Sequence, residues 1–342
     1  QRQMCIRDSG TVTIWVNKGI KIEKGVGFPD RVIGSGFFID PRGYLLTNYH
    51  VIASEVDPEY EGYSRLYIRP SDRVEEKIPA KVVGYDRIFD LALIKAEVTP
   101  QYVFSSGDEP DLKVGGPILA IGSPAGLENT VTSGIVSATG RRFLQMGDTI
   151  QVDVPINYGN SGGPLLDAAG HLVGIVFAGI EQFEGVNFAI PFGWVNKVLP
   201  RLYAGGEAKH SWLGLAVQKT DAGLEVVYAA PESPAAKAGL EAGDILLSLN
   251  GSEYRELGEI QAALLDLDVS CLVNLSWKRG EEVQTGILAL AERPFSPLEQ
   301  ALEKDARDNV LYPLFGMKLE KTGSFLWRSS YVVKRVLQGS VA

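Results

Sequence analysis

The sequence is poor in cysteine and contains no long hydrophobic run. Cys5 and Cys271 are its two cysteines among 342 residues. Two are too few for a disulfide framework, and these two are spaced too widely for a CxxC metal or redox site. The cysteines therefore do not indicate whether the protein resides in an oxidising or a reducing compartment. No window holds 18 or more consecutive apolar residues, which excludes an evident membrane-spanning helix.

Positive charge is also in short supply. Lys and Arg number 33 against 42 Asp and Glu, a net charge of −9, and no basic stripe exists to match a phosphate backbone. We therefore expect no nucleic-acid partner. Hydrophobic residues make up 45% and charged residues 22%, which is typical of a globular chain and excludes a disordered one. At roughly 100–200 residues per domain, the length predicts two or three domains.

Glycine is abundant, and the turns it favours divide the first half of the chain into short strands. There are 38 glycines, well above the usual share of about 7%. From Thr11 to Ile190, alternating or β-branched runs such as TVTIWV and LALIKAE are separated by Gly, Pro and Asp. This spacing predicts an all-β barrel or sandwich. A helix follows at Pro191–Ala204, and GGEAKHS at 205–211 reads as a linker.

The pattern after the linker is mixed. Strands are expected at 212–219, 223–229, 244–250, 271–278 and 284–290, and helices at 234–238 and 257–267. This order suits a small α+β module. A polar helix at 297–308 then leads into LFGMKLEKTG, which echoes the earlier WLGLAVQKTDAG and indicates an internal repeat.

The two ends of the sequence look cut. The start QRQMCIRDS has neither an initiator Met nor a hydrophobic signal core, so we interpret residues 1–9 as a non-native or disordered start. A targeting segment or membrane tether would have been lost with the missing part. The second copy of the repeat stops at Ala342, before its helix and remaining strands.

Three histidines limit the choice of a general base. His171 and His210 lie in a turn and in the linker, where a structural role is the more common one. His50 ends LLTNYH, at the expected end of an apolar strand. Asp90 stands directly before the strand LALIK, a position that a strand-entry turn alone would also explain.

Ser161 lies in GNSGGPL, between two predicted strands. Glycines on both sides allow a tight turn in which consecutive N–H groups point at one spot, as an oxyanion hole requires. A glycine-rich hairpin with an incidental serine is the alternative. The chain order His50, Asp90, Ser161 is that of chymotrypsin-like enzymes, and it strengthens all three candidates.

These motifs, together with IGSPAGLENTVTSGIVSATGR and GVNFAIP, resemble the HtrA/Deg family of trypsin-like serine proteases over about residues 10–204. Tyr49 and Tyr158 depart from the residues common in the family. The resemblance implies a mainly β fold, with a chymotrypsin-like double β-barrel as protease domain at 10–204. Ser161 would be the nucleophile, His50 the general base and then acid, and Asp90 the residue that holds the imidazole tautomer. The oxyanion hole would be formed at Gly159, Asn160 and Ser161, and no metal or cofactor would be required.

The family segment that lines the S1 pocket matches Asn187, Phe188, Ala189 and Ile190, which include no acid. An apolar wall disfavours Lys or Arg at the cleavage site, so we expect small or medium aliphatic P1 residues. Barrel-core residues are the alternative reading of this segment.

WLGL followed by SPAAKAGLEAGDILLSLNG resembles a PDZ domain of the HtrA type, placed at 212–292 after the linker at 205–211. Leu213, Gly214 and Leu215 would form the loop that binds a peptide's C-terminal carboxylate, and the peptide would add beside Leu215–Gln218. A plain strand start is the alternative for WLGL. Residues 293–342 would hold a second linker and an incomplete second PDZ domain, opening at Phe315–Lys318.

The resemblance implies a serine endopeptidase that cleaves unfolded or misfolded proteins and whose PDZ domain binds peptides with hydrophobic C-termini. A homotrimer, or a multiple of it, in the bacterial cell envelope would be expected, either periplasmic or tethered to the membrane. A catalytically silent PDZ-bearing chaperone or scaffold is the main alternative, although such a scaffold has no use for a complete triad. Ester hydrolysis on the same barrel is a more distant one.

Overall fold

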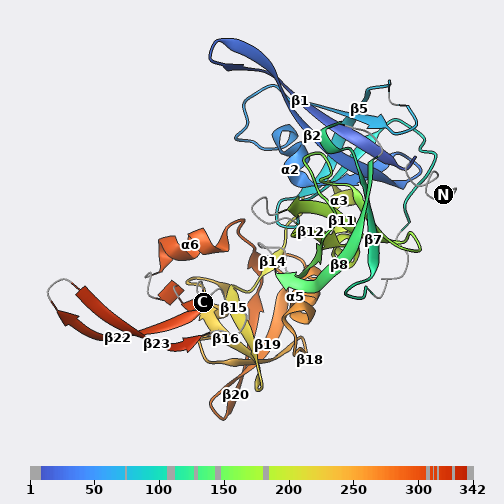
Figure 1. The fold of residues 1–342 in the computed structure, drawn as a ribbon. Coiled ribbons are helices and arrows are strands. Elements are labelled where there is room, and N and C mark those ends of the chain that lie inside the picture. Colours follow the sequence, from blue (N-terminus) through green and yellow to red (C-terminus); the bar gives the residue numbers. More distant parts are fainter. Residues whose placement is uncertain are drawn as a thin grey trace. The chain divides into compact units, whose positions relative to one another are not determined.

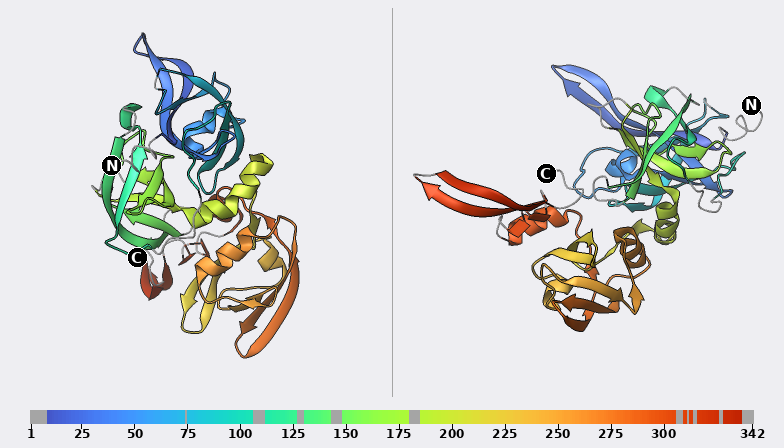
Figure 2. Two further views of the ribbon diagram at one scale, coloured as in Figure 1. Left: turned by 90° about the vertical axis from the view of Figure 1, so that its right-hand side faces the viewer. Right: turned by 60° about the horizontal axis from the view of Figure 1, so that its bottom comes forward.

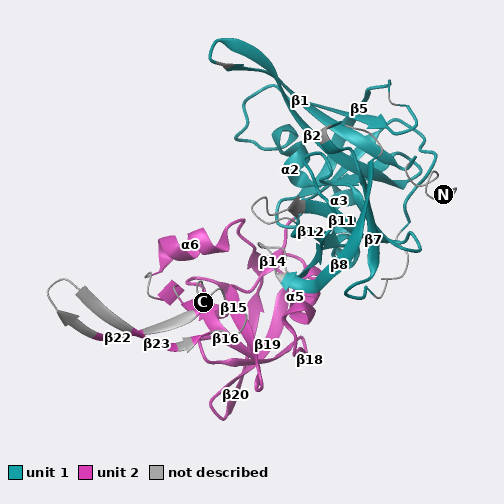
Figure 3. Cartoon of the chain, viewed as in Figure 1, with its two compact units in different colours: residues 1–208 teal, residues 209–342 magenta. Residues whose placement is uncertain are grey.

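The computed structural model describes residues 9–73, 75–105, 112–126, 130–142, 148–179, 185–305, 309–310, 312–313, 316–325 and 328–336. The chain divides into two compact units, residues 1–208 and 209–342 (Figure 3). The predicted non-native start, apart from Ser9, lies outside the described residues. No described helix is both long and apolar enough to cross a bilayer.

Unit 1 contains two closed antiparallel barrels among its described residues (Figures 1 and 2). The first barrel runs in the order β5-β4-β1-β2-β3-β6 and closes through β5 and β6. Its strands are β1 (Thr11–Glu23), β2 (Val26–Asp40), β3 (Tyr44–Thr47), β4 (Arg65–Pro70), β5 (Ile78–Asp86) and β6 (Leu91–Ala96). Buried aliphatic side chains such as Ile14, Leu45 and Ile94 fill its interior.

The second barrel runs in the order β10-β11-β12-β9-β8-β7. Its strands are β7 (Pro117–Gly122), β8 (Thr130–Arg142), β9 (Asp148–Val152), β10 (Pro164–Asp167), β11 (Leu172–Gly179) and β12 (Asn187–Pro191). Val136, Leu165 and Ala189 are among the residues of its core. The two barrels confirm the predicted mainly β, chymotrypsin-like architecture.

Short helical segments and one longer helix complete unit 1. They are α2 (Tyr49–Ile52), η1 (Ala53–Glu55), η2 (Pro124–Gly126) and α3 (Phe192–Ala204). The predicted 3.6-residue period comprises Phe192, Val195, Val198, Leu199 and Leu202. Helix α3 buries all of them except Leu199, which is half-buried, and it packs against β5 and β11. The predicted linker takes up strand structure at β13 (Gly206–Glu207), because the β5 backbone offers it parallel pairing.

Unit 2 is built around a sheet in the order β15-β16-β17-β19-β20, with β18 paired to β17. Its strands are β14 (Ser211–Trp212), β15 (Leu215–Thr220), β16 (Gly223–Ala229), β17 (Ile245–Leu249), β18 (Ser252–Glu253), β19 (Leu272–Arg279), β20 (Glu282–Ala289) and β21 (Ala291–Glu292), then the separate hairpin β22 (Met317–Phe325) and β23 (Arg328–Val336). Its helices are α4 (Pro234–Lys237), α5 (Leu257–Leu265) and α6 (Pro297–Lys304). The core includes Leu224, Leu275 and Trp277, with Ile260 of α5 packed against them.

Two predicted elements of unit 2 differ from the observed ones. The single strand expected at 212–219 is interrupted between β14 and β15, because Gly214 has a φ of 82°, which an extended strand does not allow. The polar helix expected at 297–308 ends at Lys304, since Asp305 adopts an extended backbone. Residues 306–308 lie outside the described residues.

Candidate active site

Asp90 and His50 form a hydrogen-bonded pair in the first barrel. Asp90 lies in the turn before β6 with a φ of 52°, a left-handed conformation that Asp tolerates better than most residues. The backbone N–H of His50 donates to Asp90 Oδ1 at 2.8 Å, and His50 Nδ1 lies 2.7 Å from Oδ2. Both carboxylate oxygens therefore hold the same histidine.

The structure corrects the expected location of His50. The strand ends at Thr47, and His50 lies on the one-turn helix α2 rather than at a strand end. The carbonyl of Asp90 accepts hydrogen bonds from Tyr49 N at 3.1 Å and from Asn48 Nδ2 at 2.9 Å. These bonds turn the chain out of the sheet directly after its last pairing, Thr47 with Ala92, and no local pattern reveals them.

Ser161 lies in the loop between β9 and β10 of the second barrel. Its Oγ donates to the carbonyl of Phe177 at 3.4 Å, and its own carbonyl accepts from Ser35 N at 2.8 Å. Gly162 has a φ of 86°, and a Cβ there would lie 2.2 Å from Ser35 O and 3.0 Å from Asn48 N. The serine loop is thus packed closely against the segment that leads into His50, which only a glycine at 162 allows.

Around Ser161, at residues 159–163, the backbone leaves two N–H groups available. The N–H groups of Asn160, Gly162 and Gly163 donate to Asn157, Val176 and Asn160, respectively. Among the described residues, those of Gly159 and Ser161 have no hydrogen-bond partner. Gly159 has a φ of 107°, which permits its N–H to differ in direction from its neighbours. The Oδ1 atom of the buried Asn160 side chain also has no partner among the described residues.

The four residues expected at the S1 pocket lie together on β12, and all are buried. Asn187 Nδ2 donates to the carbonyl of Val154 at 2.7 Å. The ring of Phe188 lies 6.4 Å, between centroids, from that of Phe177, the residue whose carbonyl accepts from Ser161. Residues 180–184, between β11 and β12, lie outside the described residues.

Two contributors were missed by the sequence reasoning, Phe177 and Asn48. Phe177 faces Ser161 through its backbone carbonyl, which any residue type would supply, so no sequence signal marks it. Asn48 is fully buried and holds the Asp90 backbone through its amide. A polar residue at the end of an apolar strand, two positions before a candidate histidine, was a usable signal.

A second His–Asp pair shows that this geometry alone does not mark a catalytic pair. In the turn between β10 and β11, His171 N donates to Asp167 Oδ1 at 2.7 Å, and Nδ1 lies 2.9 Å from Oδ2. Burial opposes ionisation of Asp167, but the hydrogen bonds from His171 lower the pKa of its carboxyl. What distinguishes His50 is the Ser161 loop beside its helix. Among the described residues, no cluster of His, Cys, Asp or Glu could hold a metal ion.

The two departures from the family pattern lie beside the site. The Tyr49 ring stacks on Tyr85 with centroids 5.6 Å apart, and burial raises the pKa of Tyr49. The Tyr158 ring is exposed next to the serine loop, and its hydroxyl accepts a long hydrogen bond from Ile33 N. Among the described residues, neither tyrosine side chain forms a hydrogen bond with Asp90 or Ser161.

The predicted carboxylate-binding loop of unit 2 leads into an edge strand. The carbonyls of Leu213 and Gly214 accept from Ala235 N and Ala230 N, so the loop is held against α4 and the end of β16. A Cβ on Gly214 would lie 2.1 Å from that of Ser233, which caps α4. Strand β15 pairs with β16 on one side and is an edge of its sheet, with α5 nearby.

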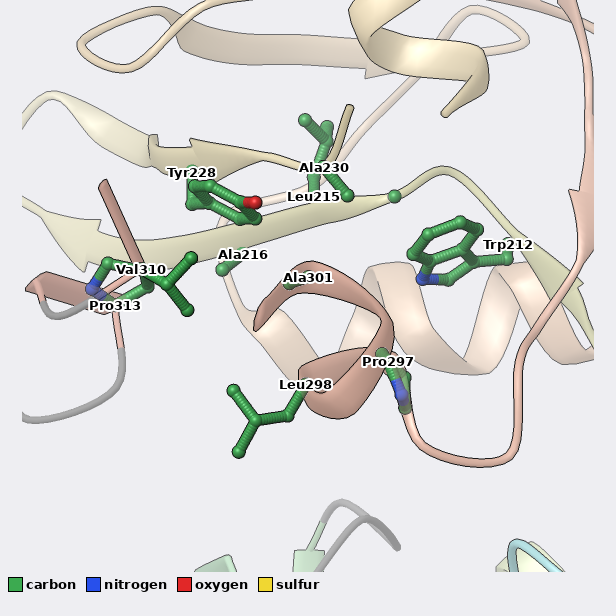
Figure 4. A pocket seen from close by; sticks show the side chains of 11 residues that line it. Trp212, Leu215, Ala216, Tyr228, Ala230, Pro297, Leu298, Ala301, Val310 and Pro313 are labelled. Carbon is green, nitrogen blue, oxygen red and sulfur yellow. The ribbon is translucent and has the colours of Figure 1, made fainter. Parts of the chain in front are cut away.

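A cavity of about 290 Å³ lies beside this loop, between the β15–β16 hairpin and α6 (Figure 4). Its lining is mainly apolar: Trp212, Gly214, Leu215, Ala216, Tyr228, Ala230, Pro297, Leu298, Ala301, Val310 and Pro313. Helix α6 is held there by Tyr228 Oη, which donates to Asp305 Oδ2 at 3.0 Å, and by an ion pair of Lys304 with Glu232. Burial, followed by the neighbouring Asp305, raises the pKa of Tyr228.

A buried carboxylate stabilises unit 2 away from these sites. Asp244 is 1% exposed and accepts two hydrogen bonds of 2.8 Å from Arg279 and one from Glu241 N. Burial raises its pKa, but the hydrogen bonds from Arg279 and Glu241 N, together with the charge of Arg279, outweigh burial and lower the pKa below its usual value. Because the folded pKa is the lower one, the stabilisation is complete above pH about 3.9 and is lost as the pH falls through the folded value.

We expect Asp244→Ala to lower the free energy of unfolding of unit 2 by about 2 kcal/mol, the cost of losing hydrogen bonds to a charged group. Urea unfolding at pH 7, followed by tryptophan fluorescence to which the buried Trp277 contributes, measures it. The difference from wild type should shrink towards pH 3. Asp221→Ala, in the exposed turn between β15 and β16, is the matched control. Equal stability of the two variants would contradict this role for Asp244.

Comparison with known proteins agrees with this fold. A family model for a trypsin-like peptidase domain matches residues 34–175, and one for a PDZ domain matches residues 211–289. A DegP-like periplasmic serine endoprotease of Marinomonas sp. is 35% identical over 327 residues, covering 91% of this chain and 68% of that protein. The chain belongs to the HtrA/DegP family of serine endoproteases. It is accordingly a serine endopeptidase with a trypsin-like domain.

Further HtrA/DegP relatives extend the likeness. A DegP-like protein of Pseudomonas fluorescens is 34% identical and covers the same shares, 91% of this chain and 68% of its own length. The solved structure of the HtrA-type protease AlgW with a tripeptide is matched with a TM-score of 0.71 and 28% identity, over 86% of this chain and 97% of that one. A serine endoprotease from Yersinia pestis is matched at 0.65 and 29%, over 86% and 98%. A model for the TP0546 family PDZ domain matches residues 298–342, where the sequence predicted a second PDZ domain.

Proposed function

We propose that this HtrA-type protease cleaves peptide bonds with Ser161 as nucleophile, His50 as general base and Asp90 as its orienting carboxylate. The observation that carries the proposal is the double hold of Asp90 on His50, with one oxygen on the backbone N–H and the other on Nδ1. This arrangement keeps the Nδ1 proton facing Asp90 and leaves Nε2 free to accept a proton. The Ser161 loop packs against the residues leading into that histidine.

The reaction proceeds by acyl transfer. The Ser161 hydroxyl turns from the Phe177 carbonyl to His50 Nε2, and Oγ attacks the substrate carbonyl carbon as the proton passes to Nε2. The carbonyl oxygen becomes an oxyanion, which accepts hydrogen bonds from Gly159 N and Ser161 N. The imidazolium then protonates the leaving amine and the C–N bond breaks. Water repeats the sequence on the ester, which releases the acid and restores Ser161.

Two unpartnered N–H groups support this assignment of the oxyanion hole. Within residues 159–163, the N–H groups of Gly159 and Ser161 have no partner among the described residues, while those of Asn160, Gly162 and Gly163 do. Donors that are fixed in advance stabilise developing charge without reorganisation at the moment of reaction. The side chain of Asn160, between them, is buried away from solvent and adds no charge to the site.

The S1 pocket is assigned to Asn187, Phe188, Ala189 and Ile190. The contact of the Phe188 ring with Phe177 connects this strand to the carbonyl that Ser161 meets. The four residues carry no negative charge that could pair with Lys or Arg, so the expected P1 residues are small or medium aliphatic. A peptide library cleaved mainly after Lys or Arg would refute this assignment.

The proposed substrates and cellular location are inferred from the named relatives. The DegP-like relatives from Marinomonas and Pseudomonas fluorescens are named periplasmic, and AlgW was solved with bound peptides. We propose that this chain works in the bacterial periplasm on unfolded or misfolded proteins, as a homotrimer or a multiple of it. Its PDZ domain, taken as residues 212–292, binds hydrophobic C-termini. A mass of one 37.1 kDa chain by light scattering at micromolar concentration would contradict the trimer.

Casein degradation combined with fluorophosphonate labelling tests the activity. The enzyme should degrade casein at neutral pH, and labelling of Ser161 should abolish degradation. Labelling without degradation would indicate an active site restricted to other substrates, such as esters. Neither labelling nor degradation would favour the silent scaffold.

Carboxylate recognition by unit 2 can be tested with one peptide in two forms. A peptide with a hydrophobic C-terminus should bind residues 213–215 and add beside β15, the edge strand of the sheet. Amidation of its terminus removes the charge that the loop N–H groups would bind. We expect binding to weaken about 10- to 100-fold, the value of a hydrogen bond to a charged group. Calorimetry measures the two affinities, and equal values would refute the carboxylate loop.

A further inference from the structure

Ser35 lies at the contact between the two barrels, within hydrogen-bond distance of the serine loop. It is fully buried on β2, in the sequence GSGFF. Its Oγ donates to the carbonyl of Gly159 at 2.7 Å, and its N–H donates to the carbonyl of Ser161 at 2.8 Å. One residue of the first barrel therefore holds the carbonyls of both proposed oxyanion donors, which belong to the second barrel.

Ser35 also accepts two hydrogen bonds, one at its hydroxyl oxygen and one at its carbonyl oxygen. Its Oγ accepts from Ser123 N at 2.9 Å, which follows β7, and its carbonyl accepts from Thr47 Oγ1 at 2.7 Å, at the end of β3. The hydroxyl thus serves as donor and acceptor at once, and its hydrogen points at Gly159 because the Ser123 bond uses a lone pair. Free rotation of this side chain would cost two hydrogen bonds in a site without exposure to solvent.

These bonds confine the peptide planes that carry the oxyanion donors. The plane between Gly159 and Asn160 is held at its oxygen by Ser35 and at its N–H by the carbonyl of Asn157. It lies between the plane that carries the Gly159 N–H and the plane that carries the Ser161 N–H. Glycine accepts many backbone angles, so Gly159 by itself does not select the direction of its N–H. The hydrogen bond from Ser35 supplies that selection.

No neighbouring side chain takes over this task. The Oδ1 atom of Asn160, the side chain in the middle of the loop, has no partner among the described residues. A Cβ on Gly122 would lie 2.6 Å from that Oδ1 and 3.1 Å from Ser35 Oγ, so the packing leaves no space for a second anchor. A serine at position 35 is small enough to fit and still reaches Gly159 with a hydroxyl.

We propose that Ser35 is a positioning residue for the oxyanion hole: its hydroxyl sets the orientation of the Gly159–Asn160 peptide and, through it, of the two N–H donors. The inference rests on the proposed roles of Gly159 and Ser161. Ser35 touches no reacting atom and acts on the transition state through the loop alone. Its loss should therefore change catalysis while leaving ground-state substrate binding nearly intact.

The test is Ser35→Ala in the full chain, assayed on a fluorogenic peptide. Complete removal of one oxyanion donor costs about 10²- to 10³-fold in kcat, and a donor left misaligned should cost less, about 10- to 100-fold. KM should change less than twofold. A peptide boronic acid forms a tetrahedral adduct on the nucleophilic serine, so its inhibition constant should rise by the same factor as kcat falls. The pH midpoint of kcat/KM should not move.

Thr13→Val is the matched control. Thr13 is also buried in the first barrel, and its Oγ1 lies 2.6 Å from Ser123 Oγ, one step further from the loop. This variant removes a hydroxyl from the same network without freeing Gly159, so kcat should stay within twofold of wild type. Equal losses in both variants, or wild-type kcat in Ser35→Ala, would overturn the inference. Parallel loss in kcat and boronate affinity in Ser35→Ala alone would support it.

Two further variants, Ser35→Cys and Ser161→Ala, separate a failure of the inference from a failure to fold and from a failure of the proposed function. If Ser35→Ala does not fold by circular dichroism, Ser35→Cys keeps a side chain of similar shape with a much weaker donor, and its kcat should also fall at unchanged KM. Wild-type kcat in Ser35→Cys would then overturn the inference. Undiminished cleavage by Ser161→Ala would refute the proposed function itself, and the inference with it. Loss in Ser161→Ala with full activity in Ser35→Ala refutes the inference alone.

Discussion

Replacement of Ser161 by alanine should lower kcat for casein or a fluorogenic peptide by about 10⁶-fold, the usual cost of removing a serine nucleophile. In the proposed mechanism the Ser161 Oγ atom forms the bond to the acyl group, and alanine has no atom that could replace it. The fold should tolerate the change, because the Ser161 backbone keeps its hydrogen bond from Ser35 N and the hydroxyl makes one long bond to Phe177 O. Initial rates measured at high enzyme concentration cover the required range.

Peptide binding provides the control for Ser161→Ala. The variant should bind a peptide with a hydrophobic C-terminus as wild type does, since the proposed peptide site, at residues 213–215, lies in unit 2. It should also take up no fluorophosphonate. Residual cleavage within 100-fold of wild type, in a preparation free of contaminating protease, would show that another residue is the nucleophile.

Replacement of Asp90 by asparagine should lower kcat by about 10⁴-fold at neutral pH. An asparagine has one acceptor oxygen where Asp90 uses two, towards the backbone N–H and Nδ1 of His50. If the amide oxygen keeps the backbone bond, the NH₂ group faces Nδ1, and Nδ1 must become an acceptor. The ring proton then lies on Nε2, which can no longer accept the proton of Ser161.

The backbone should not be the cause of this loss. Asp90 has a φ of 52°, and asparagine is one of the residues that adopts this conformation most readily. Asp167→Asn is a matched control, because Asp167 holds His171 through the same two contacts in the turn between β10 and β11. It should retain activity within twofold. A similar kcat for the two variants would show that Asp90 does not fix the His50 tautomer.

Much of the fold could be predicted because it depends on local patterns. Alternating apolar positions located most strands, and a 3.6-residue period located α3, with apolar residues at Phe192, Val195, Val198, Leu199 and Leu202. The break at Gly214 and the end of α6 at Lys304 were missed. Each depends on a backbone conformation that the surrounding structure selects, which hydrophobic periodicity does not report.

The candidate site was predicted by residue type and order, and it remains a prediction that experiments on Ser161 and Asp90 will test. His171 shows the limit of this reasoning. Its pairing with Asp167 reproduces the contacts of His50 with Asp90, although the sequence places the two residues in a plain hairpin turn. The two His–Asp pairs differ in that the Ser161 loop lies beside the helix that carries His50.

The class of this protein follows from its sequence: a β-rich module precedes a mixed α+β module, glycines flank Ser161, and histidine, aspartate and serine follow one another in a chymotrypsin-like order. How the Ser161 loop is held depends on the three-dimensional packing. Ser35 and Gly159 are 124 positions apart, and Asn48 and Asp90 are 42 apart. Hydrogen bonds of this kind form where two barrels or two strand ends meet, and their partners are chosen by packing in three dimensions, so no periodicity in the chain encodes them.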